Sequence, residues 1–131
     1  MTREEFADIL LPNVLHTRAY YEEKYGKRDL SDGAMVTRLA PSPTGFVHIG
    51  SLYQAVAAQK LAHQSGGVCF LRIEDTDQKR EVENGIEQII TSLKNYDVQF
   101  DEGPLNNGED VGDYGPYIQS KRKDIYQAFV K

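Results

Sequence analysis

The sequence predicts an α/β fold with an open parallel sheet, and three observations predict it. Two short apolar segments, 35–40 and 68–74, have the composition of buried strands, and a helical segment that stops at Gly66-Gly67 lies between them. A strand, a helix and a strand in this order form a right-handed crossover unit with parallel strands. A second helical segment follows at 80–96, so the sequence predicts the first half of a doubly wound sheet.

Residues 1–34 are expected to form a helical extension in front of the sheet domain. Thr2 and Glu5 have the spacing of a capping box at the start of an amphipathic segment, 2–11. A second helical segment at 17–25 is followed by glycine, which commonly ends a helix. Together the two segments predict a helical hairpin.

Three tyrosines of this extension lie close together in the sequence: Tyr20, Tyr21 and Tyr25. They could form a binding surface or pack onto the domain that follows. Packing is the preferred interpretation, because aromatic side chains commonly anchor contacts between elements.

The sheet domain is expected to span residues 35–131. Its elements follow in this order: a strand at 35–40, a helix from 48 or 50 to 64, a strand at 68–74, a helix at 80–96, a strand at 98–100, a loop at 102–116 and a helix at 120–131. The chain ends inside the last helix without a cap or a stop residue, which indicates a piece of a longer protein.

Composition limits the possible functions. The chain of 131 residues has 15 Lys and Arg against 20 Asp and Glu, and a net charge of −5 gives no general attraction to nucleic acid, so any RNA contact must be local. The apolar runs are too short for a membrane span and the N-terminus is too acidic for a signal peptide, so we expect a cytoplasmic protein. Cys69 has no partner for a disulfide or a metal site and is expected to be a small buried strand residue rather than a nucleophile.

The most informative segment is a rigid loop that leads into the first helix of the sheet domain. Pro41 and Pro43 fix backbone angles and Gly45 allows a conformation that other residues resist, so the loop can bring its backbone close to a ligand. His48 can donate a hydrogen bond to a phosphate oxygen, and Gly50 lets a nucleotide approach the helix start. An ordinary structural turn is the alternative for each feature taken alone.

A second charged group, Arg72-Ile-Glu-Asp-Thr-Asp77, ends the second strand. Glu74 would be costly to bury unless it faced a cation, either a substrate ammonium or an arginine such as Arg38 or Arg72. Asp75 and Asp77 suit either Mg²⁺ or the start of the next helix, and helix capping is the preferred interpretation. Because the carboxyl ends of parallel strands meet at one edge, the two groups together predict an enzyme site there.

These motifs and two later ones resemble the N-terminal part of the catalytic domain of glutamyl-tRNA synthetase, a class I aminoacyl-tRNA synthetase with a Rossmann-like sheet. The motifs are Arg38-Leu-Ala-Pro-Ser-Pro-Thr-Gly45, Val47-His-Ile-Gly50, Leu71-Arg-Ile-Glu-Asp-Thr-Asp77, Asp101-Glu-Gly-Pro104 and Gly115-Pro-Tyr-Ile-Gln-Ser120. They occur in the family's order and spacing from about residue 37 to residue 131. His48-Ile-Gly-Ser51 corresponds to the His-Ile-Gly-His signature of class I, whereas residues 1–34 lie outside the usual start of the family.

The resemblance implies ATP-dependent activation of L-glutamate to glutamyl-adenylate, followed by transfer of the glutamyl group to the 3′ end of tRNA(Glu). The partners implied are therefore tRNA(Glu), L-glutamate and ATP, and Mg²⁺ is bound with the ATP. We expect no zinc or other resident metal in this segment, no membrane partner, and no oligomer for the full enzyme.

The resemblance also implies roles for particular residues. Those implied in catalysis are His48, Gly50 and Ser51. Those implied in ATP binding are Ala40, Pro41, Thr44, Gly45, His48 and Gly50. Those implied around glutamate are Arg38, Ala40, Ser42 and Glu74. Arg38 would pair with the side-chain carboxylate of glutamate, and Glu74 would pair with its ammonium group.

Contacts with tRNA are a further implication. Thr76, Asp77 and Arg80 correspond to family positions near the acceptor end of the tRNA. The basic run Lys121-Arg-Lys123 either touches phosphate backbone or forms a solvated helix face.

Two departures from the family pattern affect what can be expected. Ser51 stands where the class I signature has a second histidine. The second signature of the family, a Lys-Met-Ser-Lys-Ser loop, and the anticodon-binding domain do not occur before Lys131. We therefore expect a fragment that does not charge tRNA by itself.

The sequence is also compatible with other functions. A paralogue that attaches glutamate to queuosine in tRNA(Asp) shares part of the pattern, but Thr76 and the segments 101–104 and 115–117 favour the full synthetase. Glutaminyl-tRNA synthetase is expected to carry different residues in the first two motifs. A non-catalytic nucleotide-binding module and a small nucleotidyltransferase are the remaining alternatives.

Overall fold

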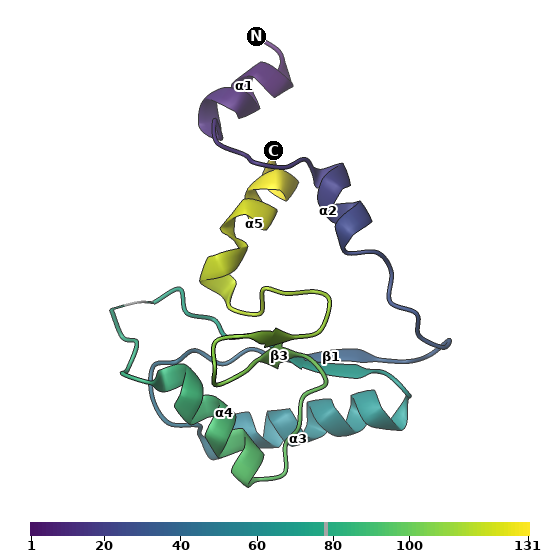
Figure 1. The fold of residues 1–131 in the computed structure, drawn as a ribbon, viewed down its shortest axis with the longest axis vertical. Helices are drawn as coiled ribbons and strands as arrows, with labels where there is room; N and C mark the ends of the chain where they lie inside the picture. Colours follow the sequence, from purple (N-terminus) through teal and green to yellow (C-terminus); the bar gives the residue numbers. More distant parts are fainter. Residues whose placement is uncertain (78) are drawn as a thin grey trace.

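A computed structural model describes residues 1–77 and 79–131 of the chain. The helices are α1 (Arg3–Leu10), α2 (Arg18–Lys24), α3 (Ile49–Gln64), α4 (Gly85–Asn95) and α5 (Lys123–Val130), with a 3₁₀ helix η1 (Gln119–Arg122) before α5. The strands are β1 (Val36–Leu39), β2 (Val68–Leu71), β3 (Gly103–Pro104) and β4 (Asp110–Val111). In Figure 1, α3 and α4 lie on one side of the strands and α2 and α5 lie on the other.

The centre of the fold is the parallel pair of β1 and β2, which α3 connects. Val36 pairs with Val68 and the register continues to Leu39 opposite Leu71. The helix ends where expected, because the N–H groups of Gly66 and Gly67 satisfy carbonyls of its last turn at 3.2 and 2.8 Å. The α/β class and the first crossover unit are thus confirmed.

The other edge of β2 is covered by two later segments of the chain rather than by a strand at 98–100. The N–H of Asp101 donates to the carbonyl of Cys69, and the N–H of Leu71 donates to the carbonyl of Glu102, both at 2.9 Å. Further along, Ile73 forms a parallel bridge with Ile118. The third strand was expected at 98–100, but pairing along this edge begins only at residue 101. It is interrupted by the short antiparallel hairpin of β3 and β4 and resumes at Ile118.

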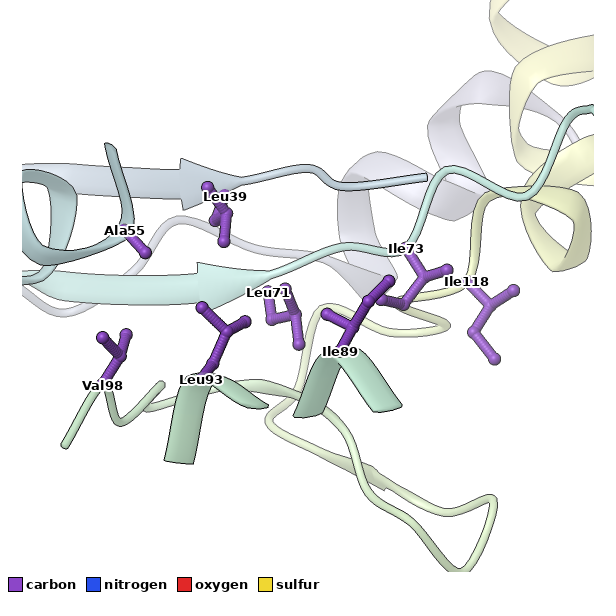
Figure 2. Packing of buried hydrophobic residues seen from close by; sticks show 8 residues of the cluster. All are labelled: Leu39, Ala55, Leu71, Ile73, Ile89, Leu93, Val98 and Ile118. Carbon is purple, nitrogen blue, oxygen red and sulfur yellow. The ribbon is translucent and has the colours of Figure 1, made fainter. Parts of the chain in front are cut away.

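The hydrophobic core lies between the sheet and the two helices α3 and α4. Figure 2 shows Leu71 of β2 and Ile73, two residues after it, beside Ile89 and Leu93 of α4. On the same side Leu39 of β1 packs in a cluster with residues of both helices. Because successive strand side chains alternate between faces, burying this odd-numbered set turns the even-numbered set to the opposite face.

The helix expected at 80–96 begins only at Gly85. The N–H of Val82 donates to the carbonyl of Pro43 at 3.0 Å, which ties the segment before α4 to the proline loop. Asn84 then adopts a left-handed conformation with φ 55°, which interrupts helical hydrogen bonding. A Cβ at Gly85 would lie 2.7 Å from the Pro43 carbonyl oxygen, so only glycine allows this approach.

The N-terminal extension forms both expected helices but not a packed hairpin. Thr2 and Glu5 make the capping box of α1, and Thr17 caps α2. Tyr21 of α2 is buried against Ile125 of α5, whereas α1 has no buried residue. The extension therefore packs on the domain through α2, whereas α1 contributes an ion pair between Asp8 and Lys131.

The tyrosines of the extension divide between packing and exposure. Tyr21 is buried, and the hydroxyl of Tyr25 donates to the carbonyl of Gly115 at 2.7 Å. Tyr20 is exposed and stacks on the ring of His16. The packing interpretation is correct for Tyr21 and Tyr25.

Among the helices of the described residues, none has the length and apolar character that a membrane span requires.

Candidate functional site

Two backbone hydrogen bonds join the two sequence motifs at the carboxyl edge of the sheet. The N–H of Arg72 donates to the carbonyl of Leu39, and the N–H of Glu74 donates to the carbonyl of Pro41, both at 2.9 Å. The parallel pairing of β1 and β2 therefore continues past the ends of both strands and brings the proline loop against the acidic segment. This edge is where open parallel sheets place their ligand crevice.

The charged side chains of the two motifs share the face of the sheet that lies away from α3. Thr37 is on the α3 face, because its hydroxyl donates to the carbonyl of Ala58 at 2.8 Å. Arg38 therefore projects from the opposite face, as do Arg72 and Glu74 of the neighbouring strand and its continuation. Two guanidinium groups and one carboxylate thus stand on one face near the crevice.

Glu74 is held by an arginine two positions before it in the chain. Its Oε1 lies 2.7 Å from the Nη2 of Arg72, and both side chains are largely shielded from solvent. The Nε of Arg72 is buried without a hydrogen-bond partner among the residues that the structure describes. Arg38 is exposed and makes no hydrogen bond or ion pair with the described residues. The sequence had offered either arginine as the partner of Glu74, and the structure selects Arg72.

The first turn of α3 is open to solvent. His48 is the N-cap residue, with φ −78° and ψ 157°, and its side chain makes no capping hydrogen bond. The imidazole is exposed, as are the two residues that follow it. A Cβ added at Gly50 would meet nothing within 4 Å, so this side of the helix start has free space. The unpaired N–H groups and the helix dipole make the position suitable for an anion.

A pocket of about 230 Å³ lies between the proline loop and the start of α3. Among the residues singled out in the sequence, those that line it are Pro41, Ser42, Thr44, Gly45, His48 and Ser51. Arg38, Ala40, Gly50 and Glu74 do not line this pocket. The structure therefore brings most of the implied ATP residues around one hollow, while Arg38 and Glu74 stand on the adjoining sheet face.

Asp75 and Asp77 do not cap α4, which corrects the preferred interpretation of the sequence. The carboxylate of Asp75 accepts hydrogen bonds from the N–H and hydroxyl of Ser120, at 2.8 and 2.5 Å. Asp77 pairs with Arg80 at 2.5 Å. The later start of α4 moves its N-terminus away from both carboxylates. The described residues contain no group of three or more His, Cys, Asp or Glu suited to a metal ion.

The residues that the resemblance assigned to tRNA fall in two places. Thr76 is exposed and lines a hollow of about 440 Å³ together with Ser120 and Lys123. Asp77 and Arg80 pair with each other in the segment before α4.

The basic run at 121–123 does not act as one surface. Arg122 donates from Nη1 to the carbonyls of Tyr114 and Pro116, at 3.0 and 2.7 Å, so its guanidinium is occupied inside the protein. Lys121 and Lys123 remain exposed. The position of Arg122 rules out the simple picture of a solvated basic helix face.

Sequence reasoning missed a partly buried ionic cluster behind the sheet edge. Arg28 of the extension pairs bidentately with Glu102, with Nη2 and Oε2 separated by 2.6 Å, and the hydroxyl of Tyr117 donates to the same Oε2 at 2.7 Å. The hydrogen bonds from Arg28 hold the pKa of Glu102 below its ordinary value, and burial raises the pKa of Tyr117. Glu102 and Tyr117 belong to quoted motifs, but Arg28 lies 74 positions from its partner and carries no local signal.

Comparison with known proteins places this geometry in a family. Residues 34–131 match the family model of tRNA synthetases class I (E and Q), catalytic domain. The whole chain is 53% identical over 131 residues to a glutamate–tRNA ligase of Clostridium perfringens (strain 13 / Type A) and 54% identical over 132 residues to that of Acetivibrio thermocellus. In both cases it spans 24% of the relative, about a quarter of its length.

The similarity to the bacterial relatives includes the N-terminal extension. Both bacterial relatives align with the entire chain, so the segment before residue 34 is shared with them although the family model starts at that residue.

Solved structures also resemble the chain. The crystal structure of a glutamate tRNA ligase from Elizabethkingia meningosepticum in complex with its amino acid aligns with 73% of this chain and 18% of its own, at 40% identity and a TM-score of 0.67. That of Elizabethkingia anophelis aligns with 74% of this chain and 19% of its own, at 39% identity and a TM-score of 0.68. The chain therefore belongs to the class I (E and Q) tRNA synthetase family, whose catalytic-domain model it matches from residue 34 onward.

Proposed function

We propose that this chain supplies the glutamate and ATP sites for the activation of L-glutamate. In this reaction the α-carboxylate attacks the α-phosphorus of ATP, forms glutamyl-adenylate and releases pyrophosphate, and the glutamyl group then passes to the 3′ end of tRNA(Glu). The observation that carries the proposal is the 2.9 Å hydrogen bond from the N–H of Glu74 to the carbonyl of Pro41. It fastens the acidic segment to the loop that opens α3, so the two anionic substrates would meet at one edge of the sheet.

The amino acid would lie on the charged face of the sheet. Arg38 has an exposed guanidinium free to take the side-chain carboxylate of glutamate in a bidentate pair. Glu74 would take the ammonium group, and its ion pair with Arg72 orients the carboxylate. Ala40 and Ser42 complete this side of the site from the proline loop.

The nucleotide would lie along the proline loop and the open start of α3. Pro41, Thr44 and Gly45 line the hollow beside His48, and Gly50 leaves space for the nucleotide to approach the helix. The imidazole of His48 and the first N–H groups of α3 would stabilise the negative charge that develops on the pentacovalent phosphorus. Ser51 adds one hydroxyl donor. Mg²⁺ would arrive with the phosphates of ATP.

The tRNA would be the partner in the second step. Thr76, Asp77 and Arg80 are proposed to lie near its acceptor end, in the segment that leads from the sheet edge toward α4. With a net charge of −5, the chain would rely on local contacts rather than on a general field. From the family resemblance we also propose that the enzyme is cytoplasmic and acts as a monomer.

Because the chain spans about a quarter of its relatives, we propose that these 131 residues do not charge tRNA by themselves. An aminoacylation assay with the purified chain, tRNA(Glu), ATP and radiolabelled glutamate tests this. No charging above a protein-free control is expected, and robust turnover would contradict the proposal.

The nucleotide site is tested with a substitution that the fold should tolerate. Gly50→Ala adds a methyl group in open space near a helix start, so the free energy of unfolding should not fall. The same methyl group would occupy the approach path of the nucleotide. Gly26→Ala is the matched control, because its Cβ would meet only ordinary contact at 4.0 Å and it lies in the extension.

Calorimetric titration of both variants with Mg-ATP gives the result. We expect ATP affinity to fall at least about tenfold in Gly50→Ala, as a steric block near the phosphates would cost more than about 1.4 kcal/mol, and to stay unchanged in Gly26→Ala. Equal affinities in the two variants would show that the nucleotide does not approach the start of α3. A folded chain that responds neither to ATP nor to glutamate would remove the proposed sites.

A further inference from the structure

The N-terminal extension reaches into the sheet domain through a short stretch that ends at Arg28. The hydroxyl of Tyr25 donates to the carbonyl of Gly115, and the hydroxyl of Tyr114 donates to the carbonyl of Gly26 at 2.8 Å. The guanidinium of Arg28 lies 3.9 Å above the centre of the Tyr114 ring. These contacts fasten residues 25–28 to the segment 114–117, which lies far from them in the sequence.

The ion pair of Arg28 is shielded from water and closely surrounded. The side chains of Arg28 and Glu102 are only 18% and 12% exposed. Glu102 also receives the Tyr117 hydroxyl, which in turn accepts a hydrogen bond from the N–H of Tyr114 at 3.1 Å. Gly112 closes over the cluster with φ 105°, and a Cβ there would lie 2.6 Å from the Cγ of Glu102. A charge pair that is this far shielded and has these additional bonds is costly to break on one side only.

The cluster continues by hydrogen bonds to the proposed glutamate site. The carbonyl of Tyr117 accepts the N–H of Ile73, and the carbonyl of Ile73 accepts the N–H of Gln119, both at 2.9 Å. Glu74 follows Ile73 directly. The segment 117–119 therefore holds the outer edge of the chain that continues β2, the edge that faces away from β1. Pro41 holds Glu74 from the inner edge, on the side of β1.

From this chain of contacts we infer that Arg28 is a positioning residue for Glu74. It acts from outside the family domain, through Glu102 and Tyr117, and keeps the segment 117–119 against the end of β2. Without that segment, the backbone at Ile73 would lose its hydrogen bonds to residues 117–119. The Arg72–Glu74 pair would then be held only by the backbone bonds to Leu39 and Pro41 on the β1 side. The inference rests on the proposed function for the role of Glu74 in glutamate binding, but not for the mechanical link itself.

Arginine is needed at this position for a geometric reason. Its planar guanidinium makes two parallel bonds to Glu102 while its face stacks on Tyr114. A lysine would keep the positive charge but would lose both the bidentate geometry and the stacking. Arg28→Lys is therefore a conservative variant that should weaken positioning while preserving the charge balance of the partly buried cluster.

Amide hydrogen exchange measured by NMR on the ¹⁵N-labelled chain tests the mechanical link. The N–H of Ile73 bonds to the segment 117–119, whereas the N–H of the adjacent Arg72 bonds to β1, so the two amides report opposite edges of one strand. The matched control is Arg18→Lys, because Arg18 is exposed and pairs with Glu22 on the surface of α2 at 2.7 Å. Tyr117→Phe is the second variant, since it removes only the hydroxyl that binds Glu102.

We expect Arg28→Lys and Tyr117→Phe to raise exchange of the Ile73 and Gln119 amides about tenfold or more relative to Arg18→Lys, with the Arg72 amide unchanged. Unchanged exchange at Ile73 and Gln119 would overturn the inference. An equal rise at Arg72 would also overturn it, because the residue would then only support global stability.

Calorimetric titration with L-glutamate connects the link to the site. We expect the Kd for glutamate to rise in Arg28→Lys and to match the wild type in Arg18→Lys. A Kd that is the same in both variants, despite faster exchange at Ile73, would show that Arg28 does not position Glu74 for the ligand. If the wild-type chain binds no glutamate, the proposed function fails for this chain, while the exchange measurement still decides whether Arg28 holds the strand end.

Discussion

The carboxylate of Asp75 accepts two hydrogen bonds from Ser120, one from the backbone N–H at 2.8 Å and one from the hydroxyl at 2.5 Å. Asp75 is 9% exposed and directly follows Glu74, and Ser120 lies in the 3₁₀ turn before α5. One side chain thus ties the carboxyl edge of the sheet to the start of the last helix. The bond continues the line of contacts that holds the segment 117–119 against β2.

Replacing Asp75 should destabilise the chain through this pair. Asp75→Asn keeps the size but loses the charge, and we expect it to lower the free energy of unfolding by about 1–3 kcal/mol, as for a buried hydrogen bond to a charged group. Ser120→Ala should cost about 1 kcal/mol. Urea unfolding of both single variants and the double variant gives their coupling, and strictly additive losses would show that the two side chains do not interact.

Stability should depend on pH through Glu102. Hydrogen bonds from Arg28, and from Tyr117, hold the pKa of Glu102 below its ordinary value in the folded chain. A carboxyl whose folded pKa is depressed stabilises the fold above its unfolded pKa of about 4.3, and this contribution is lost as pH falls through the folded pKa. We therefore expect the stability difference between wild type and Glu102→Gln to be largest near pH 7 and to shrink below about pH 4.

Urea unfolding of both proteins at pH 7, 5 and 3 measures this dependence. Glu109→Gln is the control, because Glu109 is exposed in the β3–β4 hairpin and has no comparable partner among the charged groups described. A difference for Glu102→Gln that stays constant from pH 7 to pH 3 would contradict the depressed pKa.

The single thiol should be unreactive while the chain is folded. Cys69 is fully buried in β2, and burial raises its pKa. Because the thiolate is the reactive form, both the low accessibility and the raised pKa slow its reaction. With an aromatic disulfide reagent at pH 8 we expect slow modification in buffer and fast modification in denaturing urea. Equal rates in the two conditions would show that β2 does not shield the thiol.

The core between the sheet and α4 should be sensitive to loss of volume. Leu93 is 1% exposed and packs beneath Leu71 in the cluster of Figure 2. We expect Leu93→Ala to lower the free energy of unfolding by about 2–5 kcal/mol. Leu61→Ala removes the same atoms from an exposed position of α3 and should change it by less than about 0.5 kcal/mol. Similar losses for both would contradict the placement of Leu93 in the core.

Local sequence patterns predicted the elements whose signals are local. The strand at 36–39, the helix that ends at Gln64 and the capping box of Thr2 and Glu5 all match the structure closely. Each depends on residues within a few positions of one another. The family resemblance was confirmed for the same reason, because its motifs are short and occur in order.

The start of α4 shows where a local pattern fails. Apolar spacing extends the predicted helix back to residue 80, but a tertiary bond from Val82 to Pro43 and the left-handed Asn84 delay it to Gly85. That change also reassigned Asp75 from a helix cap to the partner of Ser120. The competing interaction comes from about 40 residues away, and no window of sequence contains it.

The sequence alone determined the chemistry available at the sheet edge: two prolines and glycines in a loop, a histidine before a helix, and arginine and glutamate residues after a strand. Tertiary structure decided the partners. It paired Glu74 with Arg72 and left Arg38 exposed, and it paired Arg28 with Glu102 across 74 positions. Residue type sets which bonds a side chain can make, whereas the partner depends on which distant segments the packed sheet brings within about 3 Å.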